Sequence, residues 1–127
     1  MTALLDTHTL LWMVDDESRL SATAFVFVKD PRNTLYFSMA SAWEIAIKIG
    51  RGRLGQRIPS RIVGGDSTQM SVELFPISTN HLVSLTTLGE HHRDPFDRLL
   101  AAKCLAENLP VVSVDAGFDA YGVRRMW

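Results

Sequence analysis

The sequence contains a single cysteine and no long apolar run. Cys104 has no partner for an internal disulfide and cannot form a cysteine zinc cluster. Because small and apolar residues flank it, we expect its side chain to be buried. No apolar stretch approaches the roughly 18 to 20 residues that span a bilayer. Met1 is not followed by the basic and apolar regions of a signal peptide, so we expect a cytoplasmic protein without membrane contact.

Lysine is also scarce, since arginine outnumbers it ten to three, and the formal net charge is only −1. Five basic residues follow one another without an acid between Ile45 and Gly65, namely Lys48, Arg51, Arg53, Arg57 and Arg61. An arginine side chain can bind phosphate through two parallel hydrogen bonds. The segment is compatible with an anionic partner, although a solvated helix end and loop would have the same composition.

The 127 residues suffice for one domain with one core. Apolar, β-rich segments alternate with segments of helical periodicity. We expect strands at 2–5, 34–39, 72–77 and 111–114 and a short last strand near Val123. We expect helices at 10–14, 22–29, 41–49 and 80–88 and from 94 onward. This alternation predicts an α/β fold in which residues 1–127 form a single domain, with a central, mostly parallel sheet flanked by helices.

Four acidic residues are expected at one edge of this sheet. Asp6 directly follows the first strand, and Asp115 follows the strand at 111–114. Glu44 and Asp97 are expected in the first turns of the helices at 41–49 and from 94 onward. Ligands of open parallel sheets bind outside the carboxyl ends of the strands. The pattern therefore predicts that these acids gather at a binding site.

Three of the four acids also have a simple structural explanation. Ser41 and Glu44 match a capping box, in which the glutamate only returns a hydrogen bond to the helix start. Asp97 suits the positive end of a helix, and Asp115 suits a turn. Asp6 is the hardest to explain in this way, because a carboxylate at the end of an apolar strand costs desolvation energy. The residues alone leave these alternatives open.

Gathered carboxylates raise one another's pKa unless a cation neutralises them. Mg²⁺ prefers oxygen ligands, and Mn²⁺ accepts the same set. We therefore expect Mg²⁺, with Mn²⁺ as a substitute, and hydrolysis of a phosphodiester bond. Zinc is disfavoured because the four histidines lack a convincing ligand spacing. Of these, His91 and His92 are expected to form an exposed lead-in to the helix that follows.

Four ordered motifs are similar to those of a known family. They are LLDTH at 4–8, SAWE at 41–44, HHRDPFDRLL at 91–100 and VSVD at 112–115. Together they closely resemble a PIN domain, and specifically the VapC toxins of bacterial and archaeal type II toxin–antitoxin systems. The resemblance spans nearly the whole chain. It implies a catalytic, metal-binding quartet formed by Asp6, Glu44, Asp97 and Asp115.

The resemblance also implies supporting roles for neighbouring residues. Asp94 matches an acid that is more often a helix cap or an outer-shell group. Thr7 and Ser113 match small hydroxyl positions beside the first and last acids of the quartet. Ser113 stands where the family commonly has threonine, which keeps the hydroxyl. His8 stands where many members have asparagine, and neither departure threatens the assignment.

Proteins of this kind are RNA-cleaving endonucleases that form dimers and are inhibited by a small antitoxin. The resemblance therefore implies an RNA substrate, a cognate VapB-like antitoxin and a homodimer. Arg51, Arg53 or Arg98 would hold phosphates that flank the cleaved bond. Four aromatic residues are candidates either for an association surface or for the core: Trp12, Trp43, Phe25 and Phe27.

Other functions agree less well with the residues. A receiver domain needs an acid pair beside its first strand and a lysine after its last one. A phosphatase of the aspartyl-nucleophile type needs a second aspartate two residues after Asp6, where His8 stands. A non-catalytic RNA-binding or regulatory PIN module usually lacks one or more acids of the quartet, whereas all are present here. Cleavage of DNA remains open, because the metal chemistry is the same.

Overall fold

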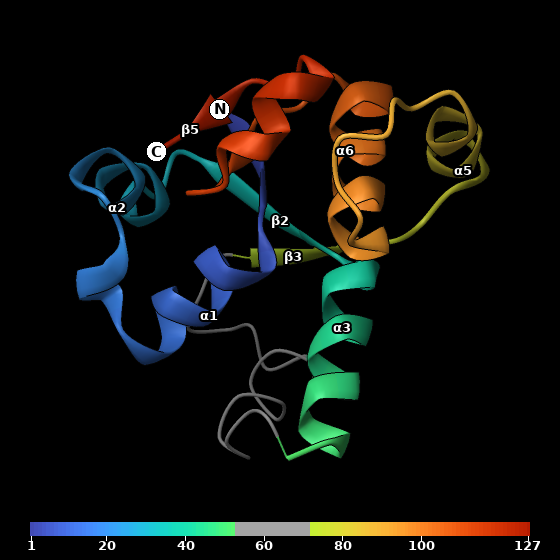
Figure 1. Cartoon of the computed structure of the whole chain (residues 1–127). Coiled ribbons are helices and arrows are strands. Elements are labelled where there is room, and N and C mark those ends of the chain that lie inside the picture. Colours follow the sequence, from blue (N-terminus) through green and yellow to red (C-terminus); the bar gives the residue numbers. More distant parts are fainter. Residues whose placement is uncertain (53–71) are drawn as a thin grey trace.

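The computed structural model describes residues 1–52 and 72–127. Its strands are β1 (Thr2–Leu5), β2 (Thr34–Ser38), β3 (Val72–Phe75), β4 (Val111–Val112) and β5 (Arg125–Met126). They form one sheet in the order β3-β2-β1-β4-β5, and each neighbouring pair is parallel. The sheet runs through the centre of the molecule (Figure 1). The predicted α/β fold with a central parallel sheet is therefore confirmed.

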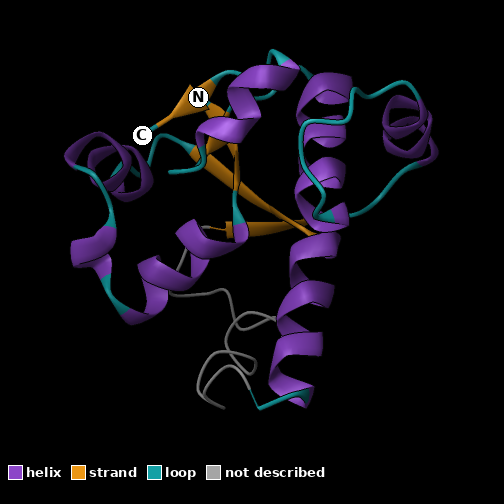
Figure 2. Ribbon diagram, in the orientation of Figure 1, coloured by secondary structure: helices purple, strands orange, loops and turns teal. Residues whose placement is uncertain are grey.

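Helices pack on both faces of the sheet (Figure 2). They are α1 (Thr7–Asp15), α2 (Ala22–Lys29), α3 (Met39–Gly50), α5 (Thr79–Thr86) and α6 (Pro95–Glu107), with the 3-10 segments η1 (Glu17–Arg19) and η3 (Ala116–Tyr121). Among the described residues, no helix combines the length and the apolarity that crossing a membrane requires.

The strands divide their side chains between two cores because successive residues of a strand point to opposite faces. Ala3 and Leu5 of β1 pack with α1, α2 and part of α3, whereas Leu4 packs with α6 and η3. In β4, Val112 belongs to the first core and Val111 to the second. Burial on both faces explains why these strands are uniformly apolar. Cys104 is buried in the second core, as expected.

Helix α3 begins two residues earlier than predicted. Ser38, the last residue of β2, caps the helix, and its Oγ accepts a hydrogen bond from the N–H of Ala40 at 3.0 Å. The alternative explanation of Glu44 as part of a capping box with Ser41 is therefore excluded. The predicted position of Glu44 in the first turn was wrong, because it lies in the second turn of α3. Ser38 and Ser41 were both possible caps for this helix. The direct junction between β2 and α3 makes Ser38 the cap.

Other element bounds differ slightly from the predicted ones. Helix α1 begins directly after Asp6, so it is longer than the segment 10–14. Strand β3 ends at Phe75, because Pro76 has no N–H for the next ladder bond. Strand β4 ends at Val112, two residues before the predicted end at 114. Strand β5 begins at Arg125, two residues after Val123.

Lys103 of α6 is fully buried behind the sheet edge. Its Nζ donates to Ser38 Oγ at 2.9 Å and to the carbonyl oxygens of Phe75 and Pro76 at 2.8 and 3.1 Å. It thus connects α6 to the cap of α3 and to the end of β3. Its acceptors carry no formal charge, and burial lowers the pKa of Lys103 to about 8.

The stability of the protein is expected to rise between about pH 8 and pH 10.5 because of Lys103. Its pKa is lower in the folded state, so folding is penalised wherever the amine is charged in both states, below about pH 8. The penalty disappears as the amine loses its proton in the unfolded chain, and the change amounts to roughly 3 kcal/mol. Urea unfolding across this range measures it. The variant Lys103→Met should lack the rise, and a constant difference between variant and wild type would contradict the assignment.

Candidate metal centre

Asp6 lies at the carboxyl end of β1, at the junction with α1. Only 4% of its surface is exposed. Its side chain makes no capping bond to α1 and instead accepts a hydrogen bond from Ser113 Oγ at 2.7 Å. Burial raises the pKa of Asp6, and the nearby charge of Glu44 adds to this effect, against the hydrogen bond from Ser113. Such a carboxylate is suited to neutralisation by a cation.

Ser113 connects the first and the last acid of the site. Its Oγ donates to Asp6 and accepts the N–H of Asp115 at 3.0 Å. Asp115 also caps η3, because its Oδ1 accepts the N–H of Gly117 at 2.8 Å. Although desolvation works to raise the pKa of Asp115, the bonds from Gly117 and His92 lower it below its usual value. The turn expected at Asp115 is present, and it fixes the carboxylate beside the sheet edge.

Glu44 reaches the same region from α3, although it is not in the first turn. It is 7% exposed, and its Oε2 lies 3.1 Å from Lys48 Nζ in the next turn. The buried Thr7 donates to Ser41 Oγ at 3.0 Å and so joins the starts of α1 and α3. This contact holds the helix that carries Glu44 against the helix that follows Asp6.

Asp97 lies in the first turn of α6, as predicted. Asp94 caps this helix and accepts the N–H groups of Phe96 and Asp97 at 2.8 and 3.4 Å. Burial raises the pKa of Asp97 to about 7, together with the negative charges of Asp6, Asp94 and Glu44. The structure therefore brings Asp6, Glu44 and Asp97 close enough for their charges to interact, and Asp115 lies close to Asp97. Figure 1 shows how the starts of α3 and α6 meet beside the sheet.

His92 belongs to this group of side chains, contrary to the expectation of an exposed lead-in. Its Nε2 lies 2.9 Å from Asp115 Oδ2, and its side chain is only 12% exposed. The ring stacks on Tyr121 at 5.3 Å and packs against Phe118 at 5.4 Å. His91 is exposed, as expected. No spacing in the sequence pairs His92 with an acid 23 residues later, so sequence reasoning missed it.

Within residues 1–52 and 72–127, the ligand atoms of His92, Asp97 and Asp115 lie within 4.8 Å of one another. Asp6 and Glu44 add two buried carboxylates to the same region. This set of donor atoms suits a divalent cation, because its ligands are mainly oxygen atoms and several buried carboxylates need neutralisation. The side chains present therefore fit a divalent cation.

The predicted phosphate-binding arginines differ in their surroundings. Arg98 donates from Nη1 to the carbonyl of Gly89 at 3.0 Å, so it holds the loop before α6 and stays partly exposed. Arg51 is exposed just after the end of α3. Arg53 lies outside the described residues, together with Arg57 and Arg61. The expectation for these side chains stays a prediction.

The four aromatic candidates divide between core and surface. Phe27 is buried in the first core, and Trp12 is partly buried against Trp127. Trp43 is 61% exposed and Phe25 is 40% exposed. Trp43 meets Phe96 edge to face at 5.4 Å, and these two residues directly precede Glu44 and Asp97 in the chain.

Gly117 is needed for the approach of His92 to Asp115. A Cβ at this position would overlap His92 Nε2 and lie 2.9 Å from Asp115 Oδ1. Gly117→Ala is expected to displace both side chains and to weaken binding of a divalent ion by about tenfold, as loss of supporting contacts does in other metal sites. Calorimetric titration with Mn²⁺ measures this. Gly50→Ala is the control, because a Cβ there meets nothing within 4 Å; equal affinities of the two variants would contradict the prediction.

The profile of the PIN domain family matches residues 3–123 of the chain. No curated protein sequence matches this chain. Three solved structures have a similar fold at 15% sequence identity. VapBC2 from Rickettsia felis, bound to a DNA fragment from its promoter, has a TM-score of 0.72 and covers 98% of this chain and 97% of that chain.

FitAcB from Neisseria gonorrhoeae has a TM-score of 0.67, and VapBC-1 from nontypeable Haemophilus influenzae has one of 0.66. In both cases the match covers 98% of this chain and 96% of the other. At this identity the structural likeness shows the fold alone. The family profile, however, extends over nearly the whole chain and includes all four acids. The chain belongs to the PIN domain family.

Proposed function

We propose that this protein is an endoribonuclease that depends on a divalent metal ion and acts as the toxin of a type II toxin–antitoxin pair. One observation carries the proposal. Four acidic side chains from four separate segments converge at the carboxyl edge of a parallel sheet, and burial raises the pKa of two of them, Asp6 and Asp97. Capping explains parts of Asp97 and Asp115, but it explains neither Asp6 nor Glu44.

In this proposal Asp6, Glu44, Asp97 and Asp115 hold one or two Mg²⁺ ions, which Mn²⁺ can replace. A bound ion would lower the pKa of an attacking water and stabilise the leaving oxygen. Ser113 orients Asp6, and the Thr7–Ser41 contact fixes the start of α3. Asp94 supports the site as the cap of α6. Arg51 and Arg98, with Arg53, bind the flanking phosphates of the RNA.

The proposed substrate and partners rest on the motifs shared with VapC toxins. Similar folds in VapBC and FitAcB structures agree with a cognate antitoxin of the VapB type, although the identity is low. A non-catalytic PIN module is the second candidate function, and a DNA-cleaving nuclease is the third. The presence of all four acids favours a catalytic protein over the non-catalytic PIN module.

The test is cleavage of end-labelled total RNA by purified protein that is free of antitoxin. We expect discrete fragments with Mg²⁺ or Mn²⁺, and none with EDTA or with duplex DNA as substrate. Cleavage of DNA but not of RNA would show that the protein is a deoxyribonuclease instead of a ribonuclease. Folded, metal-loaded protein that binds RNA without cutting it would support the non-catalytic module.

We expect the protein to form a homodimer in solution. This expectation rests on the resemblance to VapC toxins, and the exposed Trp43 agrees with it, because tryptophan is enriched at protein interfaces. Sedimentation velocity at concentrations of roughly tens of micromolar, the range of moderate dimer affinities, should show mainly the dimer. A single monomer boundary over this range would exclude the dimer.

A further inference from the structure

We propose that the imidazole of His92 binds the metal ion directly, as a nitrogen ligand beside Asp97 and Asp115, and that the site therefore prefers Mn²⁺ to Mg²⁺. This inference rests on the proposed function, but it changes the ligand set from oxygen alone to oxygen and nitrogen. It assigns a role to His92, which is not one of the four acids.

The first support is the position of the donor atoms. Two ligands at right angles around an ion, each about 2.1 Å from it, lie about 3 Å apart. His92 Nε2 and Asp115 Oδ2 are separated by 2.9 Å. Together with a carboxylate oxygen of Asp97 they all lie within 4.8 Å of one another. An ion that takes the place of the proton between His92 and Asp115 would find these three ligand atoms close together.

The second support is the fixed position of the ring. His92 stacks on Tyr121 with an angle of 14° between the rings, and its backbone N–H donates to the Tyr121 hydroxyl at 2.7 Å. Phe118 packs against the ring as well. Gly117 leaves the space that Nε2 occupies, since a Cβ there would overlap this atom. A ligand held in this way loses little further freedom when it binds an ion.

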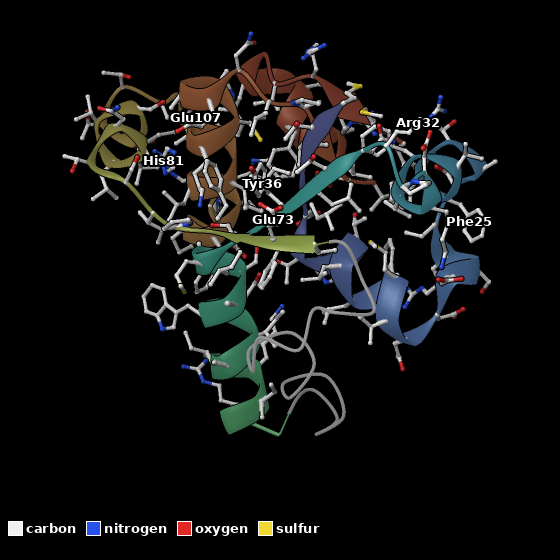
Figure 3. All side chains as sticks on the ribbon, turned by 180° about the vertical axis from the view of Figure 1, so that it is seen from behind. Phe25, Arg32, Tyr36, Glu73, His81 and Glu107 are labelled. Atoms are coloured by element: carbon white, nitrogen blue, oxygen red, sulfur yellow. The ribbon has the colours of Figure 1, made fainter. Side chains whose placement is uncertain are left out.

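The third support comes from comparison with the other buried histidine of the described chain. Both ring nitrogens of His81 have partners, since Nδ1 accepts the N–H of Ser78 at 3.0 Å and Nε2 lies 2.8 Å from Glu107. Figure 3 shows His81 beside Glu107. In His92, by contrast, Nδ1 is buried without a hydrogen-bond partner among the described residues. The ring of His92 is thus held by one polar side-chain contact, between Nε2 and Asp115, and it is this Nε2, not Nδ1, that we propose as the ligand.

A nitrogen ligand changes which ion binds best. Mg²⁺ is bound mainly by oxygen and gains little from imidazole, whereas Mn²⁺ and the later divalent metals accept it readily. Asp97 and Asp115 supply oxygen ligands that suit both ions. The ratio of the Mn²⁺ affinity to the Mg²⁺ affinity therefore depends on His92. The carboxylates contribute to the binding of both ions.

The experiment uses Mn²⁺ alone, added to the metal-free full-length protein. Electron spin echo spectroscopy of the bound Mn²⁺ detects coupling to a directly bound ¹⁴N nucleus. We expect this coupling in wild type and in the matched control His91→Ala, and we expect it to be lost in His92→Phe, which keeps a ring against Tyr121. His92→Phe should also reduce the preference for Mn²⁺ over Mg²⁺, measured by competition, by about tenfold or more.

A second measurement needs no substitution and serves if His92→Phe does not fold. In wild-type protein whose histidines alone are labelled with ¹⁵N, the Mn²⁺ signal should show coupling to ¹⁵N instead of coupling to ¹⁴N. Bound Mn²⁺ without nitrogen coupling, or an unchanged signal in folded His92→Phe, would overturn this inference and leave the proposed ribonuclease intact. Failure of wild type to bind either ion would overturn the proposed metal site itself, and this inference with it.

Discussion

Asp6→Asn is expected to abolish RNA cleavage, with a loss in kcat of about 100-fold or more. Asparagine keeps the shape of the side chain and an oxygen that can accept the hydrogen bond from Ser113. It removes the negative charge that the ion needs, and a bound ion contributes several kcal/mol to the stabilisation of a phosphodiester transition state. Single-turnover cleavage of a defined RNA fragment, at saturating Mg²⁺, measures the loss.

The fold of this variant should be unaffected. Burial raises the pKa of Asp6, so in metal-free protein its ionised form is unfavourable, and its removal should not lower the melting temperature. The control is Asp30→Asn, because Asp30 pairs with Arg32 on the surface at the end of α2, outside the group of four acids. We expect Asp30→Asn to cleave like wild type. A folded Asp6→Asn protein with wild-type cleavage would eliminate the proposed role of the acids.

The metal-free protein is expected to lose stability as the pH rises from about 4 to about 7. The pKa of Asp97 is raised from 3.8 to about 7 by burial and by Asp6, Asp94 and Glu44. Its contribution is therefore complete below the pKa of the unfolded chain and disappears as the pH passes through the folded value. Allowing for its partial exposure and for solvent screening, we expect a loss of about 2 kcal/mol. Urea unfolding in EDTA measures it, and Asp97→Asn should flatten the curve.

Addition of a divalent ion should reverse this trend. The ion binds the ionised carboxylates of the folded state, so stabilisation by Mn²⁺ should increase with pH over the same range. If the stability of metal-free wild type and of Asp97→Asn depended on pH in the same way, the raised pKa would not belong to Asp97.

Much of the fold and of the acidic group could be predicted from local patterns. Asp6 directly follows β1, and Asp115 lies three residues beyond the end of β4, so the parallel pairing of the two strands places both acids at one edge. Asp97 was placed correctly because Pro95 marks the helix start. The start of α3 was wrong because Ser38 and Ser41 are both good caps, and only the junction with β2 chooses between them.

The features that sequence reasoning missed depend on contacts between distant segments. His92 joins the site only because the turn at Asp115 and the ring of Tyr121 approach it. Lys103 received no role in the sequence analysis, yet its amine lies against the ends of β2 and β3. Neither position follows from helical or strand periodicity, since each depends on contacts with segments that are distant in the sequence.

The central claim is that a metal ion bound by these acids contacts the phosphate that is cleaved. Sulfur in place of a non-bridging oxygen at the cleaved phosphate tests it most directly, because Mg²⁺ binds sulfur poorly and Mn²⁺ binds it better. We expect one sulfur isomer to be cleaved at least about tenfold more slowly than normal RNA in Mg²⁺ and to recover in Mn²⁺. An equal loss in both ions, or cleavage of normal RNA in EDTA, would contradict the claim.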